Sequence, residues 1–402
     1  MIRCRGGADI DAVAQKGGLR QSASGGLGQV GSWLGSRLAS RRSLRYRSSI
    51  DEGLERAFNE CTSNEEFKLG EERLVILSDH HRGVRDGADD FWVAERAYNA
   101  ALGYYLETGY KLAILGDAEE LWENASAAKV VRCYRETLEL ERAFNDDDHG
   151  YWRFFGNHDL QWKEPGLLAR HLGMPGIEVH ESMKLTIKRG DTAEGYLFLV
   201  HGHQGTLFSD KFPQIGKPVV RHVWARWQRY RKHSLNTPAR NYNLREDHET
   251  AMADWAKRRR PAGEGQPVLI AGHTHRPVFG TRTQEPPPGP TELEQELEQA
   301  RRSPGRASEV PGLAAQVEHA RASTRYYDDP KPVDPPCFFN TGCCSFSDGD
   351  ITGIELVGED IRLVRWSKFA GQDAPECLQS APLIKVLEAV NAGLSLDDPQ
   401  HR

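Results

Sequence analysis

The sequence has no apolar run near the length of about 20 residues that a membrane-spanning helix needs. Its seven cysteines are scattered and show no Cys-x-x-Cys spacing, so neither a disulfide framework nor a cysteine zinc site is expected. The first residues lack the apolar core of a signal peptide. A net charge of -6 at pH 7 argues against a chain that binds polyanions over its whole surface. We therefore expect a cytoplasmic protein.

What the sequence does contain is an ordinary globular composition over 402 residues, with 38% hydrophobic and 27% charged residues. Residues 1–46 form a basic, glycine-rich tail that we expect to be disordered. Within it, "SWLGSRLASRRSLRYR" has the alternative of a basic amphipathic helix in peripheral contact with an anionic membrane. Residues 47–370 are assigned to the main domain, and residues 371–402 to a C-terminal helix and tail.

Short apolar runs predict buried strands, and helical sequence at 90–108 and 126–144 separates the early ones. The predicted strands are residues 73–78, 111–116, 151–156, 196–202, 267–272 and 337–342, followed by a hairpin over 351–366 that turns at Gly358-Glu359-Asp360. This order predicts an α/β (α+β) protein with layered sheets and helices outside. Two insertions interrupt the core, a helical cap at 206–262 and a surface excursion at 284–335.

Five of these strands end in residues that can bind metals, and seven of the 15 histidines lie in these five stretches. The stretches are Ser78-Asp79-His80-His81, Gly116-Asp117, Gly156-Asn157-His158-Asp159, His201-Gly202-His203 and Gly272-His273-Thr274-His275. Such clustering indicates one shared site. Mixed oxygen and nitrogen ligands suit transition metals better than magnesium or calcium. We expect two divalent cations, manganese first, with iron, zinc or cobalt as alternatives.

In this order and spacing, the five stretches resemble those of the calcineurin-like metallophosphoesterase family over about residues 73–345. The resemblance implies a four-layer αββα sandwich that hydrolyses a phosphate ester or pyrophosphate bond by in-line attack of a metal-bridging hydroxide. The implied ligands are Asp79, His81 and His275 for one metal, Asn157, His201 and His273 for the other, and the bridging Asp117. His158 would be the general acid, oriented by a hydrogen bond to Asp159.

The composition of the predicted cap indicates which kind of substrate to expect. Residues 211–245 contain nine Lys/Arg and no Asp or Glu, so we expect them to lie over the site and contact an anionic, phosphate-bearing molecule. The candidate substrate residues are Arg221, Arg226, Arg276 and His203.

"GDAEELWE", "HGHQGTLFSDK" and the cap before "GHTHRP" resemble the UDP-2,3-diacylglucosamine pyrophosphatase branch of the family. That branch typically carries arginine at the position of His158 and aspartate at the position of His203. The resemblance implies a nucleotide- or lipid-linked diphosphate as substrate.

Two other functions stay open. In a nuclease-like phosphodiesterase, the basic cap would follow a nucleic-acid backbone, with Trp224 or Trp227 stacking on bases. A non-catalytic scaffold would keep the fold and lack one or more metal ligands, whereas here every ligand position is filled.

Overall fold

The computed structural model describes residues 43–86, 89–122, 126–146, 149–164, 166–174, 176–206, 242–260, 265–280, 297–302, 304–306, 309–314, 317, 333–367 and 373–395. The predicted basic tail up to residue 42, the first part of the cap with Arg221, Trp224, Arg226 and Trp227, and most of the excursion lie outside these residues. Of the helices in the described ranges, none combines the length and the apolar character that a bilayer crossing requires.

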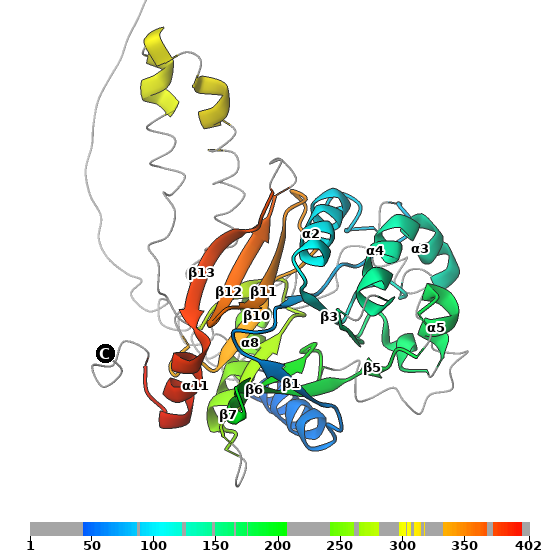
Figure 1. Ribbon diagram of the computed structural model, residues 1–402, viewed down its shortest axis with the longest axis vertical. Helices are drawn as coiled ribbons and strands as arrows, with labels where there is room; N and C mark the ends of the chain where they lie inside the picture. Colours follow the sequence, from blue (N-terminus) through cyan, green and yellow to red (C-terminus); the bar gives the residue numbers. More distant parts are fainter. Residues whose placement is uncertain are drawn as a thin grey trace, which may run out of the picture. The chain divides into compact units, whose positions relative to one another are not determined.

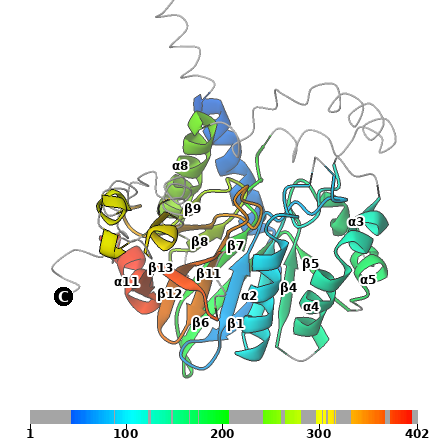
Figure 2. The same cartoon turned by 90° about the horizontal axis from the view of Figure 1, so that it is seen from above.

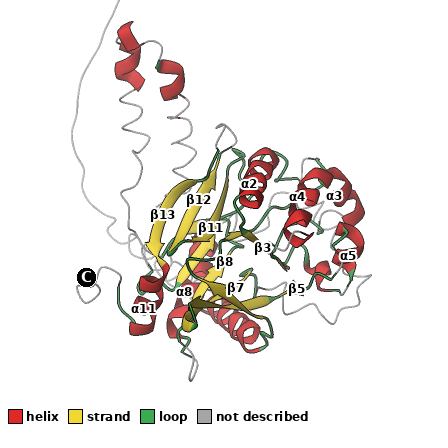
Figure 3. Cartoon of the chain, viewed as in Figure 1, coloured by secondary structure: helices red, strands yellow, loops and turns green. Residues whose placement is uncertain are grey.

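Two stacked β-sheets form the centre of the described part (Figures 1 and 3). In the described residues, one sheet has six strands in the order β1 (Asn64–Lys68), β6 (Ser182–Arg189), β7 (Thr192–Val200), β8 (Val268–Ala271), β10 (Phe338–Thr341) and β9 (Pro277–Val278). The other described sheet has seven, in the order β13 (Glu376–Pro382), β12 (Asp360–Trp366), β11 (Ile351–Val357), β2 (Leu74–Leu77), β3 (Lys111–Leu115), β4 (Tyr151–Phe154) and β5 (Val179–His180).

Alternation along the central strands builds two separate cores. Leu74 and Ile76 of β2 are fully buried in the cluster that contains residues of both sheets. Val75 and Leu77 are equally buried but belong to the cluster formed with the helices. Because successive side chains of a strand point to opposite faces, a strand that reads as a continuous apolar run is covered on both sides.

Helices cover both outer faces (Figure 2). The seven-stranded sheet is covered by α2 (Glu95–Glu107), α3 (Ala127–Cys133), α4 (Arg135–Asp146) and α5 (Leu167–Leu172). The six-stranded sheet packs against the helix of residues 43–59, α8 (Tyr242–Arg258) and α11 (Leu383–Ala392). Two short 3-10 helices, η1 (Leu160–Lys163) and η2 (Pro304–Arg306), and short helical segments at 297–302 and 310–314 are also described. The predicted α/β class with layered sheets is confirmed.

Several predicted elements need correction. The helix expected over 126–144 is two helices, α3 and α4, which break at Tyr134. The second part of the expected cap is α8, which packs against β8 and β10 as an outer layer of the sandwich. The domain does not end at residue 370, because β13 pairs with β12 and α11 buries Leu383 and Leu387 in the main core.

Candidate metal centre

The predicted metal-binding side chains follow β2, β3, β4, β7 and β8. The pairs β2–β3, β3–β4 and β7–β8 are parallel, so within each sheet the carboxyl ends of these strands lie at the same edge. Three groups of ligand atoms gather there, each with its atoms within 4.8 Å of one another. The groups are Asp79, His81 and His275; His81, Asp117 and His158; and Asp117, His201 and His273.

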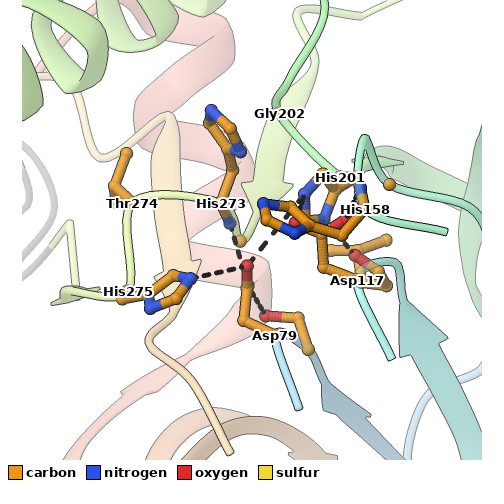
Figure 4. A network of polar contacts seen from close by, with 12 residues as sticks. Asp79, Asp117, His158, His201, Gly202, His273, Thr274 and His275 are labelled. Atoms are coloured by element: carbon orange, nitrogen blue, oxygen red, sulfur yellow. Dashed lines mark hydrogen bonds and ion pairs between the residues drawn. The ribbon is translucent and has the colours of Figure 1, made fainter. Parts of the chain in front are cut away.

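The first group surrounds one carboxylate oxygen. Asp79 Oδ1 lies 3.2 Å from His275 Nε2 and 3.9 Å from His81 Nε2, while the two imidazole Nε2 atoms are 3.0 Å apart. Figure 4 shows Asp79 between the strand ends that carry His275 and His201. Three ligand atoms at these separations can point at a common cation.

The group of Asp117, His201 and His273 adjoins the first group. Asp117 Oδ2 lies 3.2 Å from His201 Nε2 and 3.9 Å from His81 Nε2 of the first group. Asp79 Oδ1 is in turn 4.0 Å from His201 Nε2. Asp117 therefore faces ligands of both groups, the position that a bridging carboxylate requires.

A set of buried acceptor atoms without hydrogen-bond partners in the described residues fits metal binding. Side-chain atoms of this kind are costly in a protein interior and call for an explanation. At the centre they are Asp79 Oδ1, Asn157 Oδ1, His201 Nε2 and His273 Nε2. All four are the atoms that would ligate, and they include carboxylate, amide and imidazole donors that suit transition metals. The residues present thus fit metal binding.

Neighbouring groups hold two of these ligands in place. His201 Nδ1 donates to the Leu115 carbonyl at 2.7 Å, which turns Nε2 toward the site. Asp79 Oδ2 accepts from the His273 backbone N–H at 2.9 Å and from the Ser78 hydroxyl. Its other oxygen, Oδ1, is left for the centre.

Backbone strain is concentrated at the same positions. Of the six non-glycine residues with positive φ in the described part, five are predicted ligands; the sixth is Arg85. These five are Asp79, His81, Asp117, His273 and His275, with φ between 49 and 67°. Each such conformation costs about 1–3 kcal/mol and persists only where the surroundings enforce it. Strain of this kind is typical of functional sites.

Two glycines leave room for the carboxylates. A Cβ atom on Gly156 would lie 2.1 Å from Asp117 Oδ1, and one on Gly272 would lie 2.4 Å from Asp79 Oδ2. Real Cβ atoms do not approach other atoms so closely. Only glycine therefore fits at the positions that precede Asn157 and His273.

The orientation of His158 differs from the prediction. Its Nδ1 lies 2.5 Å from Glu120 Oε2, and its ring stacks on Trp122 with 4.1 Å between the centroids. Asp159 instead accepts backbone N–H groups of Gly156 at 2.6 Å and of Ala118 at 2.9 Å. The prediction that Asp159 orients His158 is therefore wrong. Asp159 ties together the loops that follow β3 and β4.

Sequence reasoning gave Glu120 no specific role. Its Oε2 also lies 3.4 Å from His81 Nδ1, so one buried carboxylate contacts both histidines. The position of Glu120, three residues after the predicted ligand Asp117, was the available hint in the sequence. Two other glutamates lie in the same stretch, so the sequence did not indicate which glutamate contacts the histidines.

His248 of α8 was missed altogether. Its Nε2 is 2.7 Å from the Gly202 carbonyl oxygen and its Nδ1 is 2.7 Å from Tyr46 Oη. Its ring centroid lies 5.0 Å from that of His273. No local pattern in the sequence of α8 points to this contact.

The electrostatics of the centre combine burial with opposite charges. Burial alone would raise the pKa of Asp117, but the charges of His201 and His158 outweigh it and hold that pKa well below its usual value. Burial, followed by the charges of His248 and His201, lowers the pKa of His273 well below its usual value. These directions favour an anionic Asp117 and a neutral His273, the forms that bind metals. Burial would lower the pKa of His201, but nearby carboxylates raise that pKa to about 9, so metal binding there would displace a proton.

The candidate substrate residues have different surroundings. His203 is 2% exposed, its ring lies 5.3 Å from that of His201, and its Nδ1 has no hydrogen-bond partner among the described residues. Arg276 forms an ion pair with the buried Glu249 of α8. His80, between Asp79 and His81 in the sequence, packs its ring against Phe91 and Tyr98 instead.

Comparisons with known proteins add little to this geometry. No protein-family model matches the chain, and neither does any curated protein. Among solved structures, the chain is similar to Vacuolar Protein Sorting 29 from Cryptosporidium parvum, with 12% sequence identity and a TM-score of 0.31. That similarity covers 77% of this chain and 98% of the other. The functional conclusion therefore rests on the site itself.

Proposed function

We propose that the chain is a phosphohydrolase of the calcineurin-like metallophosphoesterase type that works with two divalent cations. The observation that carries this proposal is the pair of adjacent ligand groups that meet at Asp117, together with their unpartnered buried acceptor atoms. Two cations held in this way supply Lewis acidity and a nucleophile at neutral pH. We propose manganese as the metal, because the donor set is mixed and contains no thiolate.

The side chains of the site divide the remaining work. Asp79 and Asp117 are buried carboxylates. Their negative charges attract cations and repel a phosphate that has no cation bound to it. Contact with Glu120 at Nδ1 leaves Nε2 of His158 as the atom that donates a proton to a phosphoryl or leaving-group oxygen. Stacking on Trp122 fixes the plane of that ring.

For the substrate we propose a nucleotide- or lipid-linked diphosphate. The resemblance of the sequence to the UDP-2,3-diacylglucosamine pyrophosphatase branch supports this choice, and Arg221 and Arg226 are proposed to meet its phosphates. His203 lies near enough to His201 to line the same space. Arg276 is proposed to hold α8 against the site through Glu249. A cytoplasmic location, with peripheral membrane contact, belongs to the same proposal.

The decisive experiment compares Asp117→Asn with Asp191→Asn, a change on an exposed turn. We expect the first variant to lose one or both metals and more activity than the roughly 10–100-fold loss typical of changes behind the ligands. Bound metal is measured by elemental analysis. Activity is measured with manganese on phosphomonoesters, cyclic nucleotides, nucleotide-linked diphosphates and DNA. Thermal unfolding adds a readout without turnover, since metal should raise the midpoint of wild type and Asp191→Asn.

The results separate the alternatives. Preferred cleavage of DNA would support the nuclease-like function. Wild-type protein that binds no transition metal and cleaves none of these substrates would support the scaffold. Normal metal content and turnover in Asp117→Asn would refute the proposed centre.

A further inference from the structure

A second candidate site lies away from the metal centre, where α3, α4 and α5 gather beside the β4–β5 edge of the seven-stranded sheet (Figures 1 and 2). Side chains of these helices line a cleft of about 430 Å³. We call it the basic cleft because its charged and titratable lining residues are Arg132, Arg135, Arg142, Arg170, His171 and Glu139. None of them belongs to the metal centre.

The positive charges of the basic cleft are only partly neutralised. Arg135 Nε lies 2.9 Å from Glu139 Oε1, and Arg142 Nε lies 3.2 Å from Asp146 Oδ2. In the part of the chain that the structure describes, no carboxylate pairs with Arg132 or Arg170. A chain with a net charge of -6 thus places an excess of guanidinium groups around one concave surface.

Helix dipoles explain only part of this arrangement. Arg132 lies in the last turn of α3, and Arg170 and His171 lie in the last turn of α5, where cations are favourable. Arg135, however, begins α4, the end of a helix at which a cation is unfavourable. Pairing with Glu139 one turn on offsets this cost, and a ligand of negative charge would offset it further.

We propose that the basic cleft binds a compact anion that carries one or two phosphate groups. Its volume falls in the range of about 300–1,000 Å³ typical of small-molecule sites. Guanidinium groups present paired N–H donors that match the oxygens of a phosphate. The concave shape favours a small anion over an extended acidic chain, and the proposal does not depend on the activity of the metal centre.

The floor of the cleft is packed and largely apolar. Leu138 and Leu172 are buried beneath the arginines. The His171 ring packs 6.1 Å from that of Trp162, which is 1% exposed and donates to Glu119 at 2.7 Å.

The test uses the full chain without added divalent cations, so that pyrophosphate is not chelated. Calorimetric titration of pyrophosphate into Arg132→Ser/Arg170→Ser is compared with Arg189→Ser/Arg302→Ser, which removes the same charge from two exposed sites elsewhere. We expect the cleft variant to bind about tenfold more weakly than wild type, since charge-assisted hydrogen bonds are lost. The control should bind as wild type. Equal affinities in the two variants would overturn the proposal.

A second arm distinguishes a soluble phosphate from a lipid headgroup. Vesicles of phosphatidylcholine with and without phosphatidic acid are sedimented with the same proteins. Weaker binding of the cleft variant, but not of the control, to phosphatidic acid vesicles would identify a headgroup site. Loss of pyrophosphate binding alone would identify a site for a soluble anion. Thermal unfolding checks that both variants are folded, as expected for exposed arginines.

Discussion

At the scale of single residues, Glu120 links the predicted general acid to His81, a predicted metal ligand. It is 6% exposed and contacts Nδ1 of both His158 and His81. Burial alone would raise its pKa, but the charge of His158 and the hydrogen bond with it hold that pKa far below its usual value. An anionic carboxylate at Nδ1 fixes the direction in which Nε2 of each ring points.

We therefore predict that Glu120→Gln lowers kcat by about 10–100-fold, the usual effect of removing a group that orients a ligand or catalytic histidine. The loss should be largest for substrates with poor leaving groups, because these need the proton from His158. Rates on aryl phosphate esters of different leaving-group pKa measure this. Glu120→Asp, which keeps the charge, should recover part of the rate. An equal loss for good and poor leaving groups would contradict this role.

The same residues show how far sequence reasoning reaches at this scale. The stretches around Asp79, Asp117 and His275 predicted which side chains meet, and the structure brings them together. The residue that contacts the His158 ring could not be predicted from the neighbours of His158 in the sequence. Asp159 follows it in sequence, but its carboxylate points to backbone N–H groups of Ala118 and Gly156. Partners contributed by another strand end become visible only in the folded chain.

At the scale of elements, the helix of residues 43–59 lies unusually close to the loop that follows β7. A Cβ atom on Gly53 would lie 2.2 Å from the backbone nitrogen of Gly205. That loop also carries His201 and His203, so the helix supports one side of the candidate metal centre. Gly103 of α2 provides the contrast, since a Cβ there would meet nothing within 4 Å.

We predict opposite effects of the same substitution in these two helices. Gly53→Ala should destabilise the protein by about 1–3 kcal/mol or more, because the added methyl forces two backbones apart. Gly103→Ala should stabilise it by about 0.5–1 kcal/mol, the usual gain in helix propensity. Chemical denaturation measures both free energies of unfolding. A stabilising Gly53→Ala would show that the contact with Gly205 is not tight.

The elements that sequence reasoning missed share a physical cause. The edge strand β1, with sequence "NEEFK", buries only Phe67, so it has no apolar run to detect. Strand β6 alternates buried and partly buried residues and was overlooked beside longer runs. Strand β13 buries only Leu378 and Ala381. Such strands are specified by pairing with a neighbour more than by their own composition.

At the scale of the whole molecule, the two sheets are joined by the segment that follows residue 372. Strand β13 completes the seven-stranded sheet, and α11 contacts both β13 and β7 of the six-stranded sheet. Leu387 of α11 is 1% exposed and packs against Gly195, where an added Cβ would lie 3.0 Å from its Cδ2. The C-terminal helix is thus part of the folding unit.

This arrangement predicts that a change in α11 destabilises the entire domain. Leu387→Ala should lower the free energy of unfolding by about 2–5 kcal/mol, as expected for a buried leucine that leaves a cavity. The loss should appear in one cooperative transition, monitored both by far-ultraviolet circular dichroism and by metal release. Glu388→Ala, an exposed change in the same helix, should leave the midpoint within about 0.5 kcal/mol of wild type. A main transition unchanged in Leu387→Ala would mean that the C-terminal segment is an appendage, with the domain ending near residue 370 after all.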